Sequence, residues 1–313
     1  MSRRRQRPGA RDLHGILLLD KPLGMSSNKA LQVALGILGA AKGGHTGALD
    51  PLATGLLPLC FGEATKIAGT LLGSRKAYLA QCQLGITTAT GDREGEVVSR
   101  RPVPPLDDAL IEGALASLRG RIVQVPPVYS ALKQDGEPLY LRARRGEDVQ
   151  VPPREVEIFR LDLVARTADT LTLEVECGSG TYIRSLAVDL GERLGCGAHL
   201  AALRRLWVEP FRAPRMLTPD QLRDAAEQGQ EVLDGLLLPM AAGLADLPAL
   251  HLDPDASQAI SQGRQIDWPA PGPRERSAAF ASDGRLLALV DCDERGRVRI
   301  LRGFNLPVAA GDA

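Results

Sequence analysis

The segment His45-Thr46-Gly47-Ala48-Leu49-Asp50-Pro51 places a carboxylate where it could act as a nucleophile. An aspartate that precedes proline is pushed towards extended backbone geometry, so a stiff turn would present the Asp50 side chain. The glycines around it allow another backbone segment to approach closely. The competing interpretation is an Asx-turn, in which Asp50 only bonds nearby backbone, and for an isolated Asp-Pro pair that is the commoner outcome.

Two further segments could complete a site around Asp50. In Gly180-Thr181-Tyr182-Ile183-Arg184, Tyr182 and Arg184 would share one face of a strand, and Tyr78 opens another predicted strand just after Lys76. An arginine beside a half-buried aspartate keeps the carboxylate ionised, as a nucleophile requires. Two tyrosines could stack on an extruded base. Taken alone, each tyrosine is more simply explained as a core or rim aromatic.

The pattern around these segments predicts a mixed α+β fold. Ser26 or Ser27 can cap a helix that runs to Leu38. Strands are expected at 15–19, 78–86, 156–164, 171–177 and 201–208, and further helices at 63–72, 107–118, 183–194 and 218–238. The proline-rich residues 122–154 indicate an inserted lobe. The sequence from about Leu250 is rich in short strands, which is typical of a small β domain.

Several common chemistries lack their motifs. No glycine pattern of a nucleotide-binding loop occurs, a GxSxG hydrolase elbow is missing, and Cys196-Gly-Ala-His199 is a lone pair of metal-ligand types. The five cysteines are scattered and include no CxxC, which indicates reduced thiols. No apolar run approaches the roughly 20 residues that span a bilayer, and no secretory signal follows the basic N-terminus. These features predict a cytoplasmic protein.

The balance of charge hides a segregation along the chain. The 313 residues carry 38 basic and 38 acidic side chains, but residues 1–215 carry 29 basic against 23 acidic ones. Residues 216–263 carry one against eight, and residues 264–313 carry eight against seven. The first two thirds could therefore face a polyanion, with the acidic segment turned away. Two basic clusters stand out, each also compatible with a solvated surface: Arg3, Arg4, Arg5, Arg7 and Arg11, and Arg142, Arg144 and Arg145 beside Tyr140.

Taken in order, these segments resemble those of the bacterial tRNA pseudouridine-55 synthase (TruB) family, from Leu13 to about Phe304. The matching pieces are GILLLDKPLGMSSN, GHTGALDPLATGLLPLCFGEATK, KAYLAQCQLGITTATGD, VPPVYSALKQDGEPLYLRARRG, GTYIRSLAVDLGERLGCGAHLAALRR and a small tail. The resemblance implies a pseudouridine synthase domain at 13–248, with a central mixed, mainly antiparallel sheet, flanking helices and a thumb-like insertion at about 122–154. It also implies a small β-rich, PUA-like C-terminal domain at 249–313, after a disordered basic leader at 1–12.

The same resemblance implies roles for individual residues. The catalytic group would be Asp50, Tyr78 and Arg184, with Arg184 pairing with Asp50 and Tyr78 assisting proton removal. The substrate-binding group would be His45, Tyr78, Tyr182, Leu203 and Asp92. Within it, Tyr78 would stack on the target uracil, Leu203 would form the opposite apolar wall, and Asp92, the acidic end of TATGD, would help to position flipped-out nucleotides.

The implied activity is the isomerisation of uridine to pseudouridine at position 55 in the T-loop of tRNA, after base flipping. The reaction involves neither redox change nor group transfer, so no cofactor or metal is expected. The implied partner is the T-arm of tRNA, with no membrane and no obligate protein partner, and a monomer is expected. A tRNA-folding chaperone role could coexist with catalysis. Two rival readings are a non-catalytic RNA-binding protein on the same scaffold and a guide-RNA-dependent relative.

Overall fold

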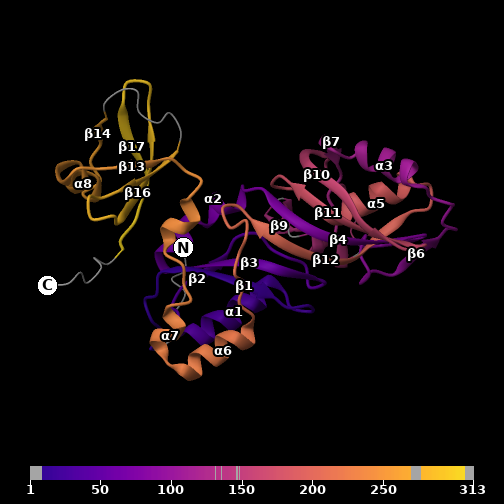
Figure 1. The fold of residues 1–313 in the computed structure, drawn as a ribbon, viewed down its shortest axis with the longest axis horizontal. Coiled ribbons are helices and arrows are strands. Elements are labelled where there is room, and N and C mark those ends of the chain that lie inside the picture. The colour runs from indigo at the N-terminus through magenta and orange to yellow at the C-terminus, as the bar shows by residue number, and fades with distance from the viewer. Residues whose placement is uncertain are drawn as a thin grey trace.

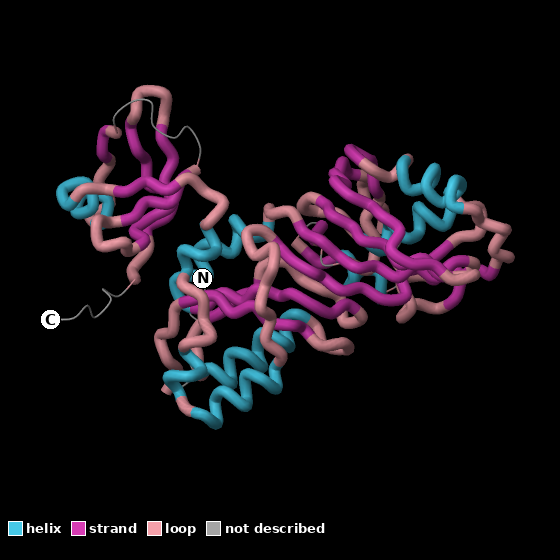
Figure 2. The backbone as a smooth tube through the Cα atoms, viewed as in Figure 1, coloured by secondary structure: helices cyan, strands magenta, loops and turns pink. Residues whose placement is uncertain are grey.

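The computed structural model describes residues 9–130, 132–134, 136–145, 147, 149–268 and 276–306. Its centre is an eight-stranded sheet of order β1-β3-β12-β4-β11-β10-β7, with β2 also paired to β3 (Figures 1 and 2). Strands β3 and β12 run parallel, and the other neighbours in this sheet are antiparallel. The strands are Gly15–Lys21 (β1), Gly43–His45 (β2), Ala53–Phe61 (β3), Lys76–Leu84 (β4), Gly120–Gln124 (β7), Arg154–Arg166 (β10), Thr170–Cys177 (β11) and Ala198–Val208 (β12).

Two groups of helices cover different parts of this sheet. Helices α1, α6 and α7 share a buried cluster with β1 and β3, whereas α3 and α5 share one with β4, β10 and β11. The helices are Ser27–Leu38 (α1), Ala68–Leu72 (α2), Asp108–Ala116 (α3), Ile183–Arg193 (α5), Pro219–Gln228 (α6) and Gln230–Asp234 (α7). Two 3₁₀ turns, Gly62–Ile67 (η1) and Met240–Leu244 (η2), complete the domain.

Local capping signals explain several helix boundaries. Ser26 caps α1 by accepting a hydrogen bond from the amide of Lys29, and Asp107 caps α3 in the same way. Thr218 and Gln221 form a reciprocal capping box at the start of α6. The segment predicted as one helix at 63–72 is a 3₁₀ turn followed by a short α-helix, and the acidic stretch at 218–238 is divided in two at Gly229, whose φ is 124°.

The inserted lobe is smaller than the range 122–154 expected from its prolines. Residues 122–124 belong to β7, which pairs with β10 at the edge of the central sheet, and Arg154 begins β10. The described residues between them form Lys133–Gln134 (β8), Glu137–Pro138 (β9) and Leu139–Arg144 (α4). A separate hairpin, Ile86–Thr88 (β5) with Val97–Arg100 (β6), follows β4.

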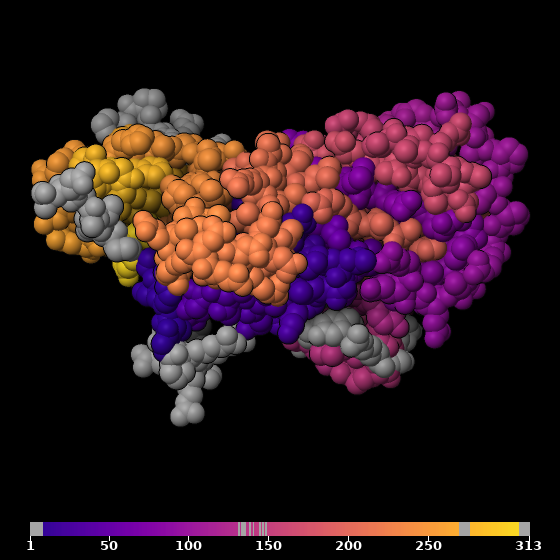
Figure 3. Space-filling model, turned by 60° about the horizontal axis from the view of Figure 1, so that its bottom comes forward, coloured from indigo at the N-terminus to yellow at the C-terminus, as the bar shows by residue number. Residues whose placement is uncertain are grey.

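A β-rich module forms one end of the elongated molecule (Figure 3). Its five-stranded sheet has the order β13-β15-β16-β17-β14. Its elements are Ala249–His251 (β13), Pro254–Ser261 (α8), Ile266–Asp267 (β14), Ser277–Phe280 (β15), Leu286–Cys292 (β16) and Arg297–Gly303 (β17). Leu289 and Phe304 share a buried cluster with Ile16 and Ile67 of the larger domain, and the amide of Asn305 donates to Glu63 at 2.7 Å.

The end of the predicted leader is anchored. Residues 1–8 lie outside the described residues, but the Arg11 guanidinium forms an ion pair with Asp234. The main chain of Arg11 also forms an isolated parallel β-bridge with that of Ala40. Arg11 therefore packs against the domain, between α1 and α7.

The five cysteines are free and buried.

Candidate active site

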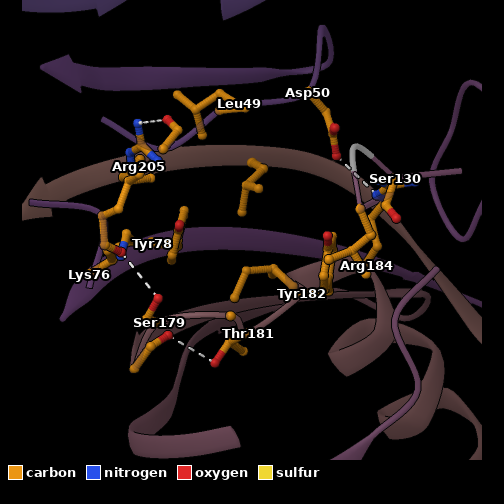
Figure 4. Close-up of a pocket in the computed structure, with 18 of the residues that line it drawn as sticks. Leu49, Asp50, Lys76, Tyr78, Ser130, Ser179, Thr181, Tyr182, Arg184 and Arg205 are labelled. Carbon is orange, nitrogen blue, oxygen red and sulfur yellow. Dashed lines mark hydrogen bonds and ion pairs between the residues drawn. The ribbon is translucent and has the colours of Figure 1, made fainter. Parts of the chain in front are cut away.

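A pocket of about 330 Å³ opens beside the carboxyl group of Asp50. It is formed by the loop between β2 and β3, by β4 and β12, and by the segment that leads into α5. Figure 4 shows Asp50 and Arg184 facing each other at one end, with Tyr78, Lys76 and Arg205 at the other. The lining residues on which the site depends are Asp50, Lys76, Tyr78, Ser130, Arg154, Tyr182, Arg184, Leu203 and Arg205.

The loop that carries Asp50 is fastened from both sides. The buried Ser27 hydroxyl accepts a hydrogen bond from the amide of Leu49 at 2.7 Å and donates to the Leu49 carbonyl at 3.0 Å. The carbonyl of Asp50 itself accepts from the amide of Ala53 at 3.0 Å. The side chain of Asp50 remains 45% exposed. A rigid turn thus holds an open carboxylate, as the Asp-Pro sequence predicts.

Arg184 is the ionic partner of Asp50, although it does not lie on a strand. It belongs to the first turn of α5, and Tyr182 is the residue before that helix. The prediction that Tyr182 and Arg184 share one face of a strand is therefore wrong. Helix α5 nevertheless places the Arg184 Nε 3.0 Å from Asp50 Oδ2, with the guanidinium only 5% exposed. Burial raises the pKa of Asp50 above its usual range, and Arg184 and Lys21 oppose this effect.

Asp92 lies behind Arg184 rather than on the open side of the pocket. Its buried carboxylate is 3.4 Å from Arg184 Nη1, and it accepts hydrogen bonds from the Thr90 hydroxyl and the Glu94 amide. Arg184 also donates to the carbonyls of Thr90 and Tyr129. The buried Asp92 carboxylate thus contacts Arg184 from behind. The expectation that Asp92 helps to position flipped-out nucleotides stays a prediction.

Tyr78 and Arg205 form the opposite wall as register partners on β4 and β12. Burial raises the pKa of Tyr78, whereas the charge and a hydrogen bond of Arg205 oppose the increase. Arg205 is 1% exposed and donates from Nε to the Leu56 carbonyl at 2.6 Å and from Nη2 to the Gly47 carbonyl at 3.0 Å. Arg205 therefore connects Tyr78 to the loop that carries Asp50.

Tyr182 and Leu203 both line the pocket. Leu203 pairs with Ala80 on the strand next to Tyr78 and on the same face of the sheet, so it does not form the wall opposite Tyr78 that the resemblance implied. The amide of the buried Gln124 side chain clamps the main chain of Tyr182, since it accepts from the Tyr182 N–H at 2.8 Å and donates to its carbonyl at 3.0 Å. The Arg154 guanidinium lies 4.8 Å from the centre of the Tyr182 ring and donates to the Gly180 carbonyl. Tyr182 is consequently fixed from two sides.

His45 is not among the residues that line this pocket. It ends β2 opposite Leu59 of β3, and its buried Nδ1 has no hydrogen-bond partner among the described residues. Burial, and to a lesser extent Arg205, lower the pKa of His45, so the neutral ring is favoured. The expected contact of His45 with substrate stays a prediction.

The charge segregation has a spatial counterpart. The pocket is lined by four cations, Lys76, Arg154, Arg184 and Arg205, and none of its lining residues comes from 216–263. That acidic segment supplies α6 and α7, which lie beside α1 and below β1 and β3 in Figure 1. Basic residues of the lobe are partly neutralised, because Arg145 forms ion pairs with Glu137 and Glu147.

Sequence reasoning missed Ser27, Gln124 and Arg205 as parts of the site. Each makes its decisive contact with a residue far along the chain, and no local motif marks such a contact. Among the described residues, no cluster of three or more potential ligands is arranged to hold a metal ion. In that same part of the chain, no helix has the length and apolar character needed to cross a membrane.

Comparison with known proteins finds relatives along nearly the whole chain. The model of the TruB family pseudouridylate synthase N-terminal domain matches residues 36–183, and that of the tRNA pseudouridylate synthase B C-terminal domain matches residues 184–245. A tRNA pseudouridine synthase B from Xanthomonas campestris is 56% identical over 302 residues, covering 96% of this chain and 97% of the relative. One from Stutzerimonas stutzeri is 48% identical over 289 residues, covering 92% and 94%.

Solved structures support the fold. A chain in the structure of an H/ACA RNP bound to a substrate RNA containing 2'-deoxyuridine has a TM-score of 0.73 at 22% identity, covering 93% of this chain and 85% of that one. A chain in the archaeal box H/ACA sRNP Nop10-Cbf5 complex has a TM-score of 0.72 at 23% identity, covering 94% and 87%. With these matches added to the Asp50, Tyr78 and Arg184 geometry, the chain belongs to the TruB family of pseudouridylate synthases.

Proposed function

We propose that this protein isomerises uridine to pseudouridine at position 55 in the T-loop of tRNA. The observation that carries the proposal is the ion pair between Asp50 and the buried Arg184, at the mouth of a pocket that Tyr78 and Tyr182 line. Support for a tRNA substrate comes from the relatives named tRNA pseudouridine synthase B. The target base must leave its stack to reach Asp50, at a cost of a few kcal/mol that stacking on the pocket tyrosines would offset.

The chemistry assigns Asp50 the role of nucleophile, attacking either C1′ of the ribose or C6 of the ring. The N1–C1′ bond breaks, a C5–C1′ bond forms, and the electron pair of the broken bond stays with the uracil ring. The C5 proton is removed, N1 gains a proton, and the aspartate is released. Tyr78, beside the Arg205 guanidinium, is placed to assist removal of the C5 proton. Because burial raises its pKa, the phenol is protonated and can take that proton only as it passes its own hydroxyl proton on, for example towards N1, which gains one. Reactants and product have the same atoms and oxidation level, so the reaction itself consumes no co-substrate.

The resident charges suit this scheme. Arg184 partly neutralises Asp50 through the contact of its Nε with Oδ2, and the Asp50 side chain remains accessible from the pocket. Leu203 offers an apolar surface on the strand next to Tyr78, where a flat base could lie. Binding of the T-arm by the lobe and by the β-rich C-terminal module, in a cytoplasmic monomer, completes the proposal.

The test is incubation with an unmodified tRNA transcript, followed by mapping of pseudouridine at each T-loop uridine. Asp50→Asn should abolish turnover while tRNA binding stays near that of the wild type. Asp20→Asn is the matched control, because Asp20 pairs with Arg204 and takes no part in the pocket. Near-normal pseudouridine formation by Asp50→Asn would refute the assignment.

A second function, assistance of tRNA folding without catalysis, is tested by the same variant. If Asp50→Asn protein restores tRNA folding or growth in cells that lack the enzyme, the scaffold has an activity separate from isomerisation. Turnover of the bare transcript also decides between a stand-alone enzyme and a guide-dependent one, since no guide RNA is present in that assay.

A further inference from the structure

Ser130 has a buried hydroxyl that bonds to nothing else in the described protein. The residue is 5% exposed and lines the catalytic pocket, and its Oγ has no hydrogen-bond partner among the described residues. Buried hydroxyls are almost always paired, because an unmade hydrogen bond away from water costs free energy. The exception therefore calls for a partner from outside the chain.

The other serine and threonine hydroxyls that line this pocket are satisfied by the protein itself. Ser179 donates to the Leu72 carbonyl at 3.1 Å, and Thr181 donates to the Gly178 carbonyl at 3.1 Å. Ser27, behind the Asp50 loop, makes two bonds to Leu49. Among the described residues, Ser130 contributes the one hydroxyl in the set of buried side-chain atoms that lack a partner.

Ser130 is held close to the reacting groups. Its amide donates to the Val128 carbonyl at 2.9 Å, and the carbonyl of the preceding residue, Tyr129, accepts from Arg184 Nη2 at 2.9 Å. Arg184 in turn pairs with Asp50. Figure 4 shows Ser130 beside the Asp50–Arg184 pair. A nucleotide that brings its C1′ or C6 to Asp50 enters the pocket that Ser130 lines.

We propose that Ser130 Oγ forms a hydrogen bond with the target nucleotide and is a substrate-positioning residue of this enzyme. The proposal rests on the proposed function. A hydroxyl both donates and accepts, so a uracil carbonyl, the ring N3–H or the ribose 2′-hydroxyl could each be the partner. All of them belong to the same bound nucleotide.

The test compares Ser130→Ala with Ser185→Ala in the full chain, using a tRNA transcript. Ser185 donates to the Val125 carbonyl at 2.7 Å. Removing this hydroxyl weakens the anchoring of the segment that leads to Ser130, but it removes a hydroxyl that already has a partner in the protein. Ser130→Ala should lower kcat/KM about tenfold and leave the unfolding midpoint in urea unchanged or raised. Ser185→Ala should show the reverse pattern, with a lower midpoint and kcat/KM within about twofold of the wild type.

Two outcomes would overturn the proposal: a Ser130→Ala enzyme with wild-type kcat/KM, or one whose activity falls only in proportion to lost folded protein. Either would leave the proposed function intact, because the wild type and Asp50→Asn test that separately. A transcript with 2′-deoxyuridine at the target identifies the partner of Ser130, when its binding free energy to the wild type and to Ser130→Ala is measured. If the losses in binding free energy from Ser130→Ala and from the deoxy substitution do not add, the partner is the 2′-hydroxyl. If they add, the partner is the base.

Discussion

Replacing Arg205 by methionine should damage both the fold and the site, whereas the same change at Arg204 should do little. The two arginines are neighbours on β12 but differ in environment. Arg205 is 1% exposed and bonds to two main-chain carbonyls, those of Leu56 and Gly47. Arg204 is 39% exposed and makes a two-pronged pair with Asp20 at 3.0 and 2.7 Å.

The magnitude follows from those contacts. Each buried carbonyl that loses its donor lowers the free energy of unfolding by about 1–3 kcal/mol, so the two carbonyls unpaired by Arg205→Met would together cost roughly 2–6 kcal/mol. Removal of a buried guanidinium that has no carboxylate partner offsets part of this, and we expect a net loss of about 3 kcal/mol. An exposed ion pair contributes about 0–1 kcal/mol, which bounds the effect of Arg204→Met.

The activity should fall further than the stability alone explains. Gly47 stands three residues before Asp50, so releasing its carbonyl from Arg205 loosens the catalytic loop. A shift of about 1 Å at a reacting group can cost 10²-fold in rate, which sets the expected loss of kcat. Urea unfolding and single-turnover pseudouridine formation measure the two effects separately. Equal unfolding free energies for Arg205→Met and Arg204→Met would refute the reasoning, as would a wild-type kcat in the Arg205 variant.

Gly55→Ala should cost roughly 2–5 kcal/mol in urea unfolding, because φ is 94° and the new Cβ would stand 2.2 Å from the Arg205 carbonyl oxygen. Gly73→Ala is the control, with an ordinary φ of −75° and its nearest contact at 3.7 Å, and equal stability of the two variants would contradict the argument. Lys76→Met should change how stability varies with alkaline pH, since burial lowers the folded-state pKa of Lys76 from 10.5 to about 8. Between those values the unfolded chain binds more protons than the folded chain, so rising pH favours the folded state. From pH 8 to pH 10, the free energy of unfolding of the wild type should therefore rise by about 2 kcal/mol relative to that of the variant. Parallel unfolding curves across that range would rule this out.

Local patterns predicted the segments that carry Asp50 and Tyr78, whereas the catalytic roles expected of the two residues came from the family resemblance. Asp50 precedes a proline in a glycine-rich loop, and Tyr78 lies near the start of a strand, so each segment could be assigned without knowing its neighbours. Taken alone, the two residues were more simply explained as an Asx-turn and a core aromatic. The stripe of Ile183, Leu186 and Leu190 likewise predicted α5, which buries these residues. What failed was the boundary before it. Tyr182 and Arg184 are two residues apart, which suits a strand face but equally suits a residue before a helix and one in its first turn.

The supporting contacts could not be predicted because they join distant parts of the chain. Ser27 bonds to Leu49, 22 positions away, and Gln124 bonds to Tyr182, 58 positions away. Arg205 reaches Leu56 across 149 positions. Nothing in the local pattern around a serine, a glutamine or an arginine specifies such a partner. The strand order, which brings β12 beside β3, creates the contact of Arg205. The packing of α1 against the Asp50 loop, and of β7 against the segment before α5, creates the other two.

The distribution of buried charge explains how a chain with no net charge can present a cationic pocket. Lys21, Lys76 and Arg205 are all buried, and none of them appears in an ion pair between described residues. Main-chain carbonyls solvate their charges instead, as when Lys21 donates to Pro22 and Met25. A carbonyl dipole stabilises a cation without cancelling its field, and the field of Lys21 extends to Asp50. It acts against the burial that raises the pKa of Asp50 and favours the ionised carboxylate that attack on the nucleotide requires.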